Sequence, residues 1–173
     1  KRFLINKYIN LENSLFYKVF NKHIWYKKSK VIASFLSIKS EIPTEKINKF
    51  IISDGKILCL PVINEKNDGI IFKSFDYGNT LEEGKFGVKE PVSGKSYLPD
   101  IILTPCLAFD IYGYRLGYGG GYYDKTISNL NSISHKFLTI GLAYDAQIIE
   151  KVPHDHYDQK LNYILTEKQL YEI

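Results

Sequence analysis

The sequence predicts a three-layer α/β/α sandwich with a mostly parallel sheet, and two observations lead to this prediction. Short apolar runs rich in β-branched residues alternate along the chain with segments whose apolar residues recur at helical spacing. This alternation is typical of βαβ units, in which helices cover both faces of a parallel sheet. The length of 173 residues suits one hydrophobic core, so we expect a single domain over residues 1–173.

The first third of the chain predicts one complete βαβ unit. An amphipathic helix is expected over residues 11–28, followed by a central strand over the apolar residues 31–38. A second helix is expected over residues 44–52, where apolar side chains fall on one face. A strand over residues 57–63 then completes the unit.

The middle of the chain is expected to be less regular. Residues 69–75 predict a strand at the edge of the sheet, because polar residues surround it. Over residues 76–99, glycines, prolines and charged residues alternate without periodicity, and a connection of this length favours a ligand-facing loop. Beyond it we expect one helix and three strands: strands over residues 101–109, 136–144 and 162–165, and a helix over residues 122–130.

The composition argues against several classes of protein. The 23 basic and 19 acidic residues give a formal charge of +4, and the lysines are scattered, so no nucleic-acid partner is expected. No apolar run reaches the roughly 18 residues of a membrane helix, and no signal peptide is visible. We therefore expect a cytoplasmic protein. We also expect it to be a monomer. Cys59 and Cys106 lie in apolar runs, where a thiol usually behaves as a small buried hydrophobe.

Glycines are concentrated between the strand expected to end near Phe109 and the helix expected to begin near Tyr122. In α/β sheets, ligands bind at such strand-to-helix junctions. Bare backbone amides and a helix N-terminus attract anions such as phosphate. The cluster holds four of the chain's 12 glycines, Gly117, Gly119, Gly120 and Gly121.

The residues around the glycines narrow the kind of site. Tyr122 and Tyr123 stand where the common nucleotide-binding loop has lysine and a hydroxyl, and a glycine would be needed at Tyr122 for the dinucleotide fingerprint. A flexible surface turn is the alternative. Arg115 and Asp124 flank the cluster and argue against that alternative, because arginine grips phosphate and a carboxylate can hold magnesium.

The run of residues 114–124, Tyr-Arg-Leu-Gly-Tyr-Gly-Gly-Gly-Tyr-Tyr-Asp, follows the segment Thr-Pro-Cys-Leu-Ala-Phe-Asp at residues 104–110. Together they resemble the signature of the 5-formyltetrahydrofolate cyclo-ligase family. The resemblance covers nearly the whole chain, and its further parts are Ser34-Phe-Leu-Ser with Glu41-Ile42, Leu60-Pro61, Gly84-Lys-Phe-Gly87 with Glu90-Pro91, and Val152-Pro153 with Asp158.

The resemblance implies an ATP-dependent ligase that converts 5-formyltetrahydrofolate to 5,10-methenyltetrahydrofolate and releases ADP and phosphate. It also implies a fold similar to the ribose-phosphate isomerase and CoA-transferase group. A formamide carbonyl is a poor electrophile, and phosphorylating its oxygen creates a good leaving group. In such a reaction the enzyme mostly positions two substrates and neutralises charge.

The same resemblance implies roles for individual residues. Arg115 and Tyr122 are the expected catalytic residues. The positions matched to ATP are Arg115, Leu116, Gly117, Tyr118, Gly119, Gly120, Gly121, Tyr122 and Tyr123. The positions matched to the folate are Leu36, Glu41, Tyr118, Gly119, Gly120, Gly121 and Tyr122. The positions matched to Mg²⁺ are Asp124 and Asp158.

Each acidic position also has a simpler explanation. Asp124 could be a helix-dipole partner in a first turn, and Asp158 could belong to a solvated polar loop. Glu41 could be an exposed loop acid. Two other functions also stay open, namely another ATP-using transferase and a non-catalytic metabolite-binding module on the same fold.

The N-terminus departs from the family pattern. The family has a basic Lys-x-x-Leu-Arg segment that helps to hold ATP, and residues 1–5, Lys-Arg-Phe-Leu-Ile, match only its first and fourth positions. The chain also contains no methionine. We therefore expect that a few natural residues precede Lys1 and that they include the basic segment.

Overall fold

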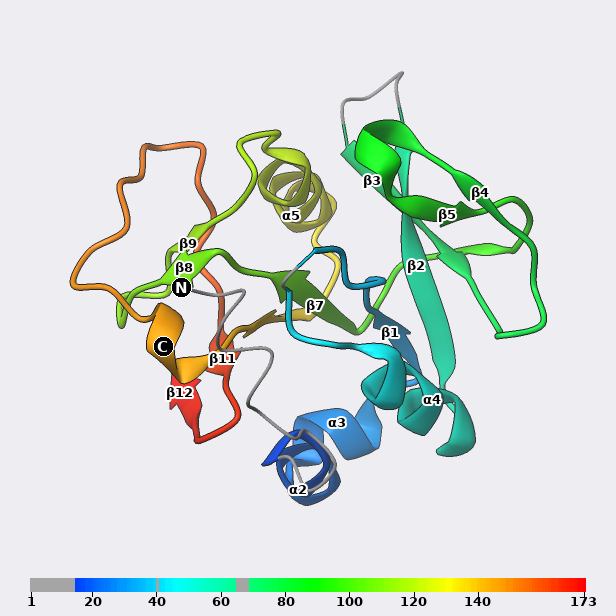
Figure 1. Ribbon diagram of the computed structural model, residues 1–173, viewed down its shortest axis with the longest axis horizontal. Coiled ribbons are helices and arrows are strands. Elements are labelled where there is room, and N and C mark those ends of the chain that lie inside the picture. Colours follow the sequence, from blue (N-terminus) through cyan, green and yellow to red (C-terminus); the bar gives the residue numbers. More distant parts are fainter. Residues whose placement is uncertain (1–14, 40, 65–68) are drawn as a thin grey trace.

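The computed structural model describes residues 15–39, 41–64 and 69–173, and an eight-stranded mixed sheet lies at its centre (Figure 1). The pairings from β11 through β10, β7 and β1 to β2 are parallel, whereas the three outer pairings are antiparallel. The predicted α/β class with a mostly parallel sheet is therefore confirmed. In spatial order the strands are β12 (Leu170–Glu172), β11 (Tyr163–Leu165), β10 (Leu138–Leu142), β7 (Ile101–Pro105), β1 (Val31–Ala33), β2 (Ile57–Asn64), β3 (Gly69–Ser74) and β6 (Ser96–Tyr97).

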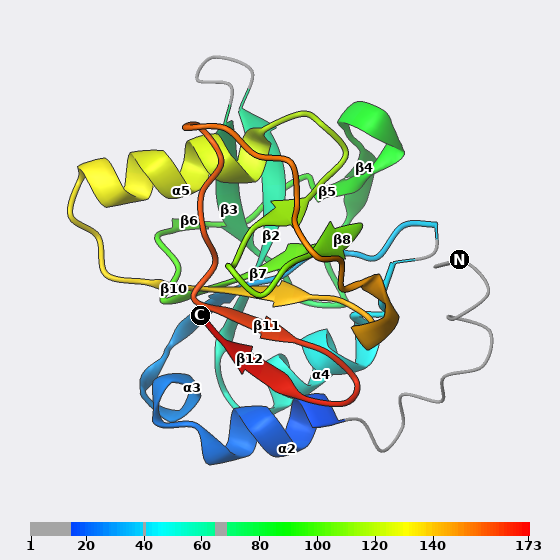
Figure 2. The same ribbon diagram turned by 90° about the vertical axis from the view of Figure 1, so that its left-hand side faces the viewer.

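Helices cover both faces of the sheet, as Figure 2 shows. Helices α2 (Leu15–Lys22), α3 (Ile24–Lys28) and α4 (Glu45–Ser53) lie on one side, and α5 (Tyr122–Ser132) lies on the other. Among the described residues, no helix is long and apolar enough to cross a membrane.

The period of two along each strand divides the core between the two faces. In β1, the Ile32 side chain packs in the larger cluster with α2, α3 and α4. The next residue, Ala33, packs in the cluster that contains Leu130 of α5. Burial on both faces explains why the central strands read as continuous apolar runs.

The helix predicted over residues 11–28 is two helices in the described part, and residues 11–14 lie outside it. The break falls at His23, whose backbone is extended with φ −82° and ψ 133°. The break brings the rings of Phe20 and Tyr26 into a stack with centroids 5.1 Å apart. Residues six apart on a straight helix would not lie on the same face, so packing of both rings in one core favours the break.

Several other bounds differ from the prediction. The strand expected over residues 31–38 ends at Ala33, and the strand expected over residues 101–109 ends at Pro105. The short strand β8 (Ala108–Phe109) pairs instead with β9 (Arg115–Leu116) in a separate two-stranded sheet. The prediction of an edge position for β3 was wrong, because β6 pairs with its outer side.

The predicted loop over residues 76–99 is also more ordered than expected. It contains β4 (Leu81–Glu83), the 3₁₀ turn η2 (Lys85–Gly87), β5 (Lys89–Pro91) and β6. Strands β4 and β5 form an antiparallel hairpin in which Glu82 lies opposite Glu90. A second 3₁₀ turn, η3 (Asp145–Gln147), follows β10.

Candidate active site

A cavity of about 510 Å³ lies where β1 and β7 end. The carboxyl ends of parallel strands meet at one edge of a sheet, so the segments that follow them lie side by side. Every residue that the sequence assigns to ATP, folate or Mg²⁺ lines this one cavity. Its walls are Phe35, Leu36, Ile38, Lys39 and Glu41 after β1; Pro61, Ile63 and Ile70 of β2 and β3; Val88 and Glu90 of the hairpin; Pro105, Cys106 and Leu107 after β7; residues 115–124; and Pro153 and Asp158.

The glycine segment leads from β9 into α5 along one side of the cavity. Gly119 has φ +87° and Gly121 has φ +65°, and this left-handed region of backbone conformation favours glycine. Gly121 is the N-cap residue of α5, so the first turn of this helix opens on the cavity. The helix N-terminus and the bare amides make this side suited to an anion.

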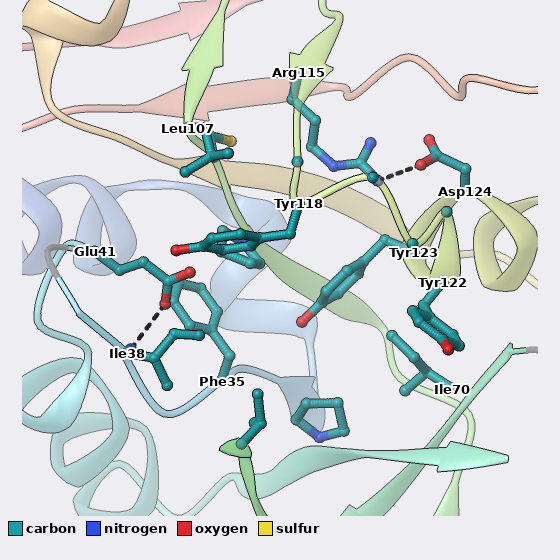
Figure 3. Close-up of a pocket in the computed structure, with 18 of the residues that line it drawn as sticks. Phe35, Ile38, Glu41, Ile70, Leu107, Arg115, Tyr118, Tyr122, Tyr123 and Asp124 are labelled. Carbon is teal, nitrogen blue, oxygen red and sulfur yellow. Dashed lines mark hydrogen bonds and ion pairs between the residues drawn. The ribbon is translucent and has the colours of Figure 1, made fainter. Parts of the chain in front are cut away.

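Arg115 and Asp124 form an ion pair at the same side of the cavity (Figure 3). Arg115 Nη2 lies 3.1 Å from Asp124 Oδ2, and the side chains are 5% and 19% exposed. Arg115 Nη1 also donates to the carbonyl oxygen of Gln159 at 3.3 Å. A guanidinium carries five N–H donors, so these two bonds leave donors for a ligand.

The backbone that follows Asp158 contacts the Asp124 carboxylate. The N–H group of Gln159, the next residue, donates to Asp124 Oδ1 at 2.9 Å. Asp158 Oδ2 accepts from the N–H group of Asp155 at 2.8 Å, and both Asp124 and Asp158 line the cavity. Two carboxylates that are 34 positions apart in the sequence therefore line the same cavity, and their binding of Mg²⁺ stays a prediction.

Asp124 and Asp158 supply too few ligands to surround a metal ion, and such a partial set of protein ligands is typical of magnesium sites. In the described ranges, no group of three or more His, Cys, Asp or Glu side chains could hold a metal ion. Mg²⁺ is usually bound through one or two carboxylates together with substrate phosphates and several waters. Asp124 and Asp158 line a cavity together with a helix N-terminus suited to an anion, which fits that pattern.

Asp110 explains how the segment that carries Asp158 is held in place. Its fully buried carboxylate accepts from the N–H groups of Tyr112 and Tyr114, both at 3.0 Å. It also accepts from the N–H group of Val152 at 2.9 Å. These bonds tie the β8–β9 turn to the start of the segment that ends at Asp158. Sequence reasoning gave Asp110 no role.

Glu41 lies on the side of the cavity opposite the ion pair (Figure 3). It is 5% exposed, which rules out the explanation of an exposed loop acid. Its Oε2 atom accepts from the N–H group of Ile38 at 3.0 Å. Leu36, the other predicted folate position before it, also lines the cavity.

Three tyrosines of the glycine segment differ in orientation. Tyr118 points toward Glu41, whereas the hydroxyl of Tyr123 points to the middle of the cavity (Figure 3). The ring of Tyr122 packs against Gly120, where an added Cβ would lie 2.7 Å from it. Burial, and then the charge of Glu41, raise the pKa of Tyr123, so its hydroxyl stays protonated at neutral pH.

The two cysteines are buried and free, as predicted. Burial raises the pKa of each thiol to about 12. Cys106 lines the cavity, but a thiol with so high a pKa is a poor nucleophile near neutral pH. Residues 1–5, which match the family's basic segment only at the first and fourth positions, lie outside the described residues, so the expectation that the basic segment precedes Lys1 stays a prediction.

Comparisons with known proteins identify the family of the chain. The model of the 5-formyltetrahydrofolate cyclo-ligase family matches residues 6–167. The chain is 33% identical over 147 residues to the 5-formyltetrahydrofolate cyclo-ligase of Escherichia coli K12, covering 82% of this chain and 80% of that protein. It is 33% identical over 159 residues to the Mus musculus 5-formyltetrahydrofolate cyclo-ligase, covering 84% of this chain and 77% of that protein. The NMR structure of Aquifex aeolicus 5,10-methenyltetrahydrofolate synthetase superposes with a TM-score of 0.75 at 30% identity, covering 99% of this chain and 88% of that one.

Proposed function

The chain belongs to the 5-formyltetrahydrofolate cyclo-ligase family and has 5-formyltetrahydrofolate cyclo-ligase activity, and from this premise we propose that the reaction uses ATP and which residues carry it out. The proposal rests mainly on one observation. The anion-binding side of the cavity, with Arg115 and the N-terminus of α5, shares one space with an apolar side that holds the buried Glu41. A phosphate donor and a folate therefore have complementary walls in a single cavity.

The reaction joins two substrates in two steps. The formyl oxygen attacks the γ-phosphorus of ATP, so that a new O–P bond forms and ADP leaves. Nitrogen-10 of the folate then attacks the formyl carbon and loses its proton, and phosphate leaves with the former formyl oxygen. Catalysis of such a transfer depends on positioning and on neutralising the charge of the phosphoryl group.

We place the phosphates of ATP along the glycine segment. The N–H groups at the start of α5 and the remaining donors of Arg115 would meet the phosphate oxygens. The ion pair with Asp124 holds the guanidinium in place beforehand, so little of its conformational freedom is lost on binding. Tyr122 stays a candidate catalytic residue, and the orientation of Tyr123 makes its hydroxyl a second candidate for the formyl oxygen.

We propose Asp124 and Asp158 as the residues that would hold Mg²⁺. When bound, the ion would neutralise charge on the phosphates that is otherwise repelled by these carboxylates. The bond from the Gln159 N–H group to Asp124 ties the residue that follows Asp158 to the Asp124 carboxylate, which supports a shared site.

We place the folate on the opposite side, against Leu36 and Glu41. A pterin edge offers adjacent N–H groups, and a buried carboxylate in a pocket with apolar walls is a strong acceptor for them. The backbone bond from Ile38 fixes one oxygen of Glu41. This arrangement leads the formyl group toward the glycine segment.

A stoichiometric assay tests the proposal. ADP and 5,10-methenyltetrahydrofolate are measured together after mixing the protein with Mg²⁺, ATP and 5-formyltetrahydrofolate. We expect one ADP for each methenyl product. ADP without methenyl product would identify another ATP-using transferase or a hydrolase, and binding of both ligands without either product would identify a non-catalytic module. The monomeric state and the cytoplasmic location stay predictions from the sequence.

A further inference from the structure

The β4–β5 hairpin brings a second buried carboxylate, Glu90, into the cavity. Glu90 belongs to one of the segments that carry the family resemblance, but neither the sequence analysis nor the proposed function gives it a role. Glu90 of β5 is 8% exposed and lines the cavity together with Val88 from the same hairpin. Its neighbours along the wall are the apolar side chains of Ile63 and Ile70. A carboxylate in such a place is costly to bury unless its oxygens have hydrogen-bond partners.

Among the described residues, one oxygen of Glu90 has a hydrogen-bond partner. Oε1 accepts from the N–H group of Ile63 at 3.2 Å. Within residues 15–39, 41–64 and 69–173, no donor reaches Oε2. That oxygen is therefore an acceptor available to a molecule in the cavity.

The hairpin is built to keep Glu90 in this position. Gly84 lies against it, because a Cβ added there would come within 2.6 Å of Glu90 Oε1 and Cγ. Glu82 is the cross-strand partner of Glu90, and like charges directly opposite each other destabilise a pair of strands. Pairing Glu82 with Glu90 therefore does not stabilise the hairpin.

The chemistry of the folate indicates which part of it meets Glu90. The glutamate end of the substrate carries carboxylates, which Glu90 would repel. The reduced pterin ring carries N–H and amino donors on more than one edge and has flat apolar faces that suit Ile63, Ile70 and Val88. We propose that Glu90 is a second pterin-binding residue, accepting a hydrogen bond from a ring N–H or amino group of the folate while Glu41 binds another edge.

This proposal rests on the proposed function, and binding measurements keep the two separable. Calorimetric titration of 5-formyltetrahydrofolate into the wild type and into Glu90→Leu needs no turnover. Loss of a hydrogen bond to a charged acceptor should weaken folate binding by roughly 10- to 100-fold. The KM for ATP should change less than about twofold, because Glu90 does not contact the nucleotide in this arrangement.

Two further variants make the test sharper. Glu83→Leu is the matched control, because Glu83 is an exposed acid of the same hairpin, and it should bind folate as the wild type does. Gly84→Ala retains the Glu90 carboxylate but forces it to move, because the added Cβ would lie 2.6 Å from Glu90 Oε1. The backbone itself accepts alanine, since φ at Gly84 is −87°. This variant should weaken folate binding in the same direction as Glu90→Leu.

The outcomes decide between a binding role and a structural one. If Glu90→Leu lowers the thermal midpoint but binds folate as Glu83→Leu does, Glu90 is structural and the proposal is wrong. Competition by p-aminobenzoylglutamate, which lacks the pterin, should be equal in the wild type and Glu90→Leu. If Glu90→Leu weakens the binding of this fragment as much as it weakens the binding of 5-formyltetrahydrofolate, Glu90 contacts the tail and the pterin assignment is wrong. A wild type that binds folate but makes no methenyl product would contradict the proposed reaction while leaving the binding comparison intact.

Discussion

Arg115 and Asp124 form an ion pair with each other, and both are hydrogen-bonded to the backbone of Gln159. The ion pair spans 3.1 Å, Arg115 donates to the carbonyl oxygen of Gln159, and the N–H group of Gln159 donates to Asp124. The glycine segment, the start of α5 and the segment that carries Asp158 are thereby joined at one point. The groups proposed for phosphate and for magnesium thus depend on each other.

Replacing Arg115 with alanine should impair the use of ATP more than the binding of folate. The loss of a charge-assisted phosphate contact should lower kcat/KM for ATP by about 1.5 to 3 kcal/mol in transition-state stabilisation. Steady-state rates at limiting ATP measure the effect. Arg115→Lys keeps the charge but loses the planar fork, so we expect an intermediate value.

Lys136→Ala is a suitable control for Arg115→Ala, because Lys136 is exposed and precedes β10 at the opposite edge of the sheet from the cavity. Arg115→Ala also leaves Asp124 without its cation, so thermal unfolding must show that the variant is folded at the assay temperature. A folded Arg115→Ala with the parent's kcat/KM for ATP would remove the glycine segment from the phosphate site.

Asp124→Asn and Asp158→Asn should both raise the Mg²⁺ concentration that gives half-maximal rate. Each substitution removes one negative oxygen ligand, and the affinity of such sites follows the number of ligand charges, so we expect a change of roughly tenfold or more. Asp155→Asn is the matched control on the same loop, since asparagine can still accept from Tyr157 as Asp155 does. A normal Mg²⁺ dependence in Asp158→Asn would exclude Asp158 from the metal site.

The parts of the fold that local patterns determine could be predicted from the sequence. Helix α4 and strand β2 begin and end within one residue of the predicted bounds, because regular apolar spacing and a glycine turn mark them. The hairpin of β4 and β5 could not be predicted. Its segments Leu-Glu-Glu and Lys-Glu-Pro have no apolar alternation, and their pairing depends on contacts with β2 that are distant in sequence.

The same distinction separates the site residues that could be predicted from the sequence from those that could not. Arg115, Asp124 and Glu41 could be predicted because they stand at recognisable places in the motifs, and the structure brings them to one cavity. Asp110 and Glu90 could not be assigned a role. Their carboxylates are held by backbone N–H groups at Val152 and Ile63, and no sequence pattern indicates which distant N–H group a carboxylate will meet.

Asp110→Ala should destabilise the protein more than it perturbs the chemistry of any one substrate. It leaves three N–H groups without their charged acceptor, and hydrogen bonds to a charged group contribute about 1.5 to 3 kcal/mol each. Urea unfolding should show that the free energy of unfolding falls by at least about 3 kcal/mol, provided that water does not replace the acceptor of every one of these N–H groups. Asp158 accepts from the backbone N–H group of Asp155, so Asp158→Ala should lower the free energy of unfolding much less. Equal losses in the two variants would contradict the anchoring role of Asp110.

The buried thiols predict how stability changes at alkaline pH. Burial raises the pKa of Cys59 and of Cys106 from 9.0 to about 12 in the folded protein, whereas in the unfolded chain both thiols regain ordinary values. Between about pH 9 and pH 12 the folded state therefore holds more protons than the unfolded state, and the free energy of unfolding falls as pH rises. Below about pH 8 the thiols are protonated in both states, and this contribution is fully present.

Urea unfolding at pH 8 and at pH 10.5 measures the loss of unfolding free energy, and Cys59→Ala should show a smaller difference between the two pH values than the wild type. A thiol reagent at pH 8 should label both cysteines only as fast as the protein unfolds. Rapid labelling of Cys106 in the folded protein would show that its thiol is reached through the cavity, and a pH dependence of unfolding that Cys59→Ala leaves unchanged would exclude the thiol of Cys59 as its source.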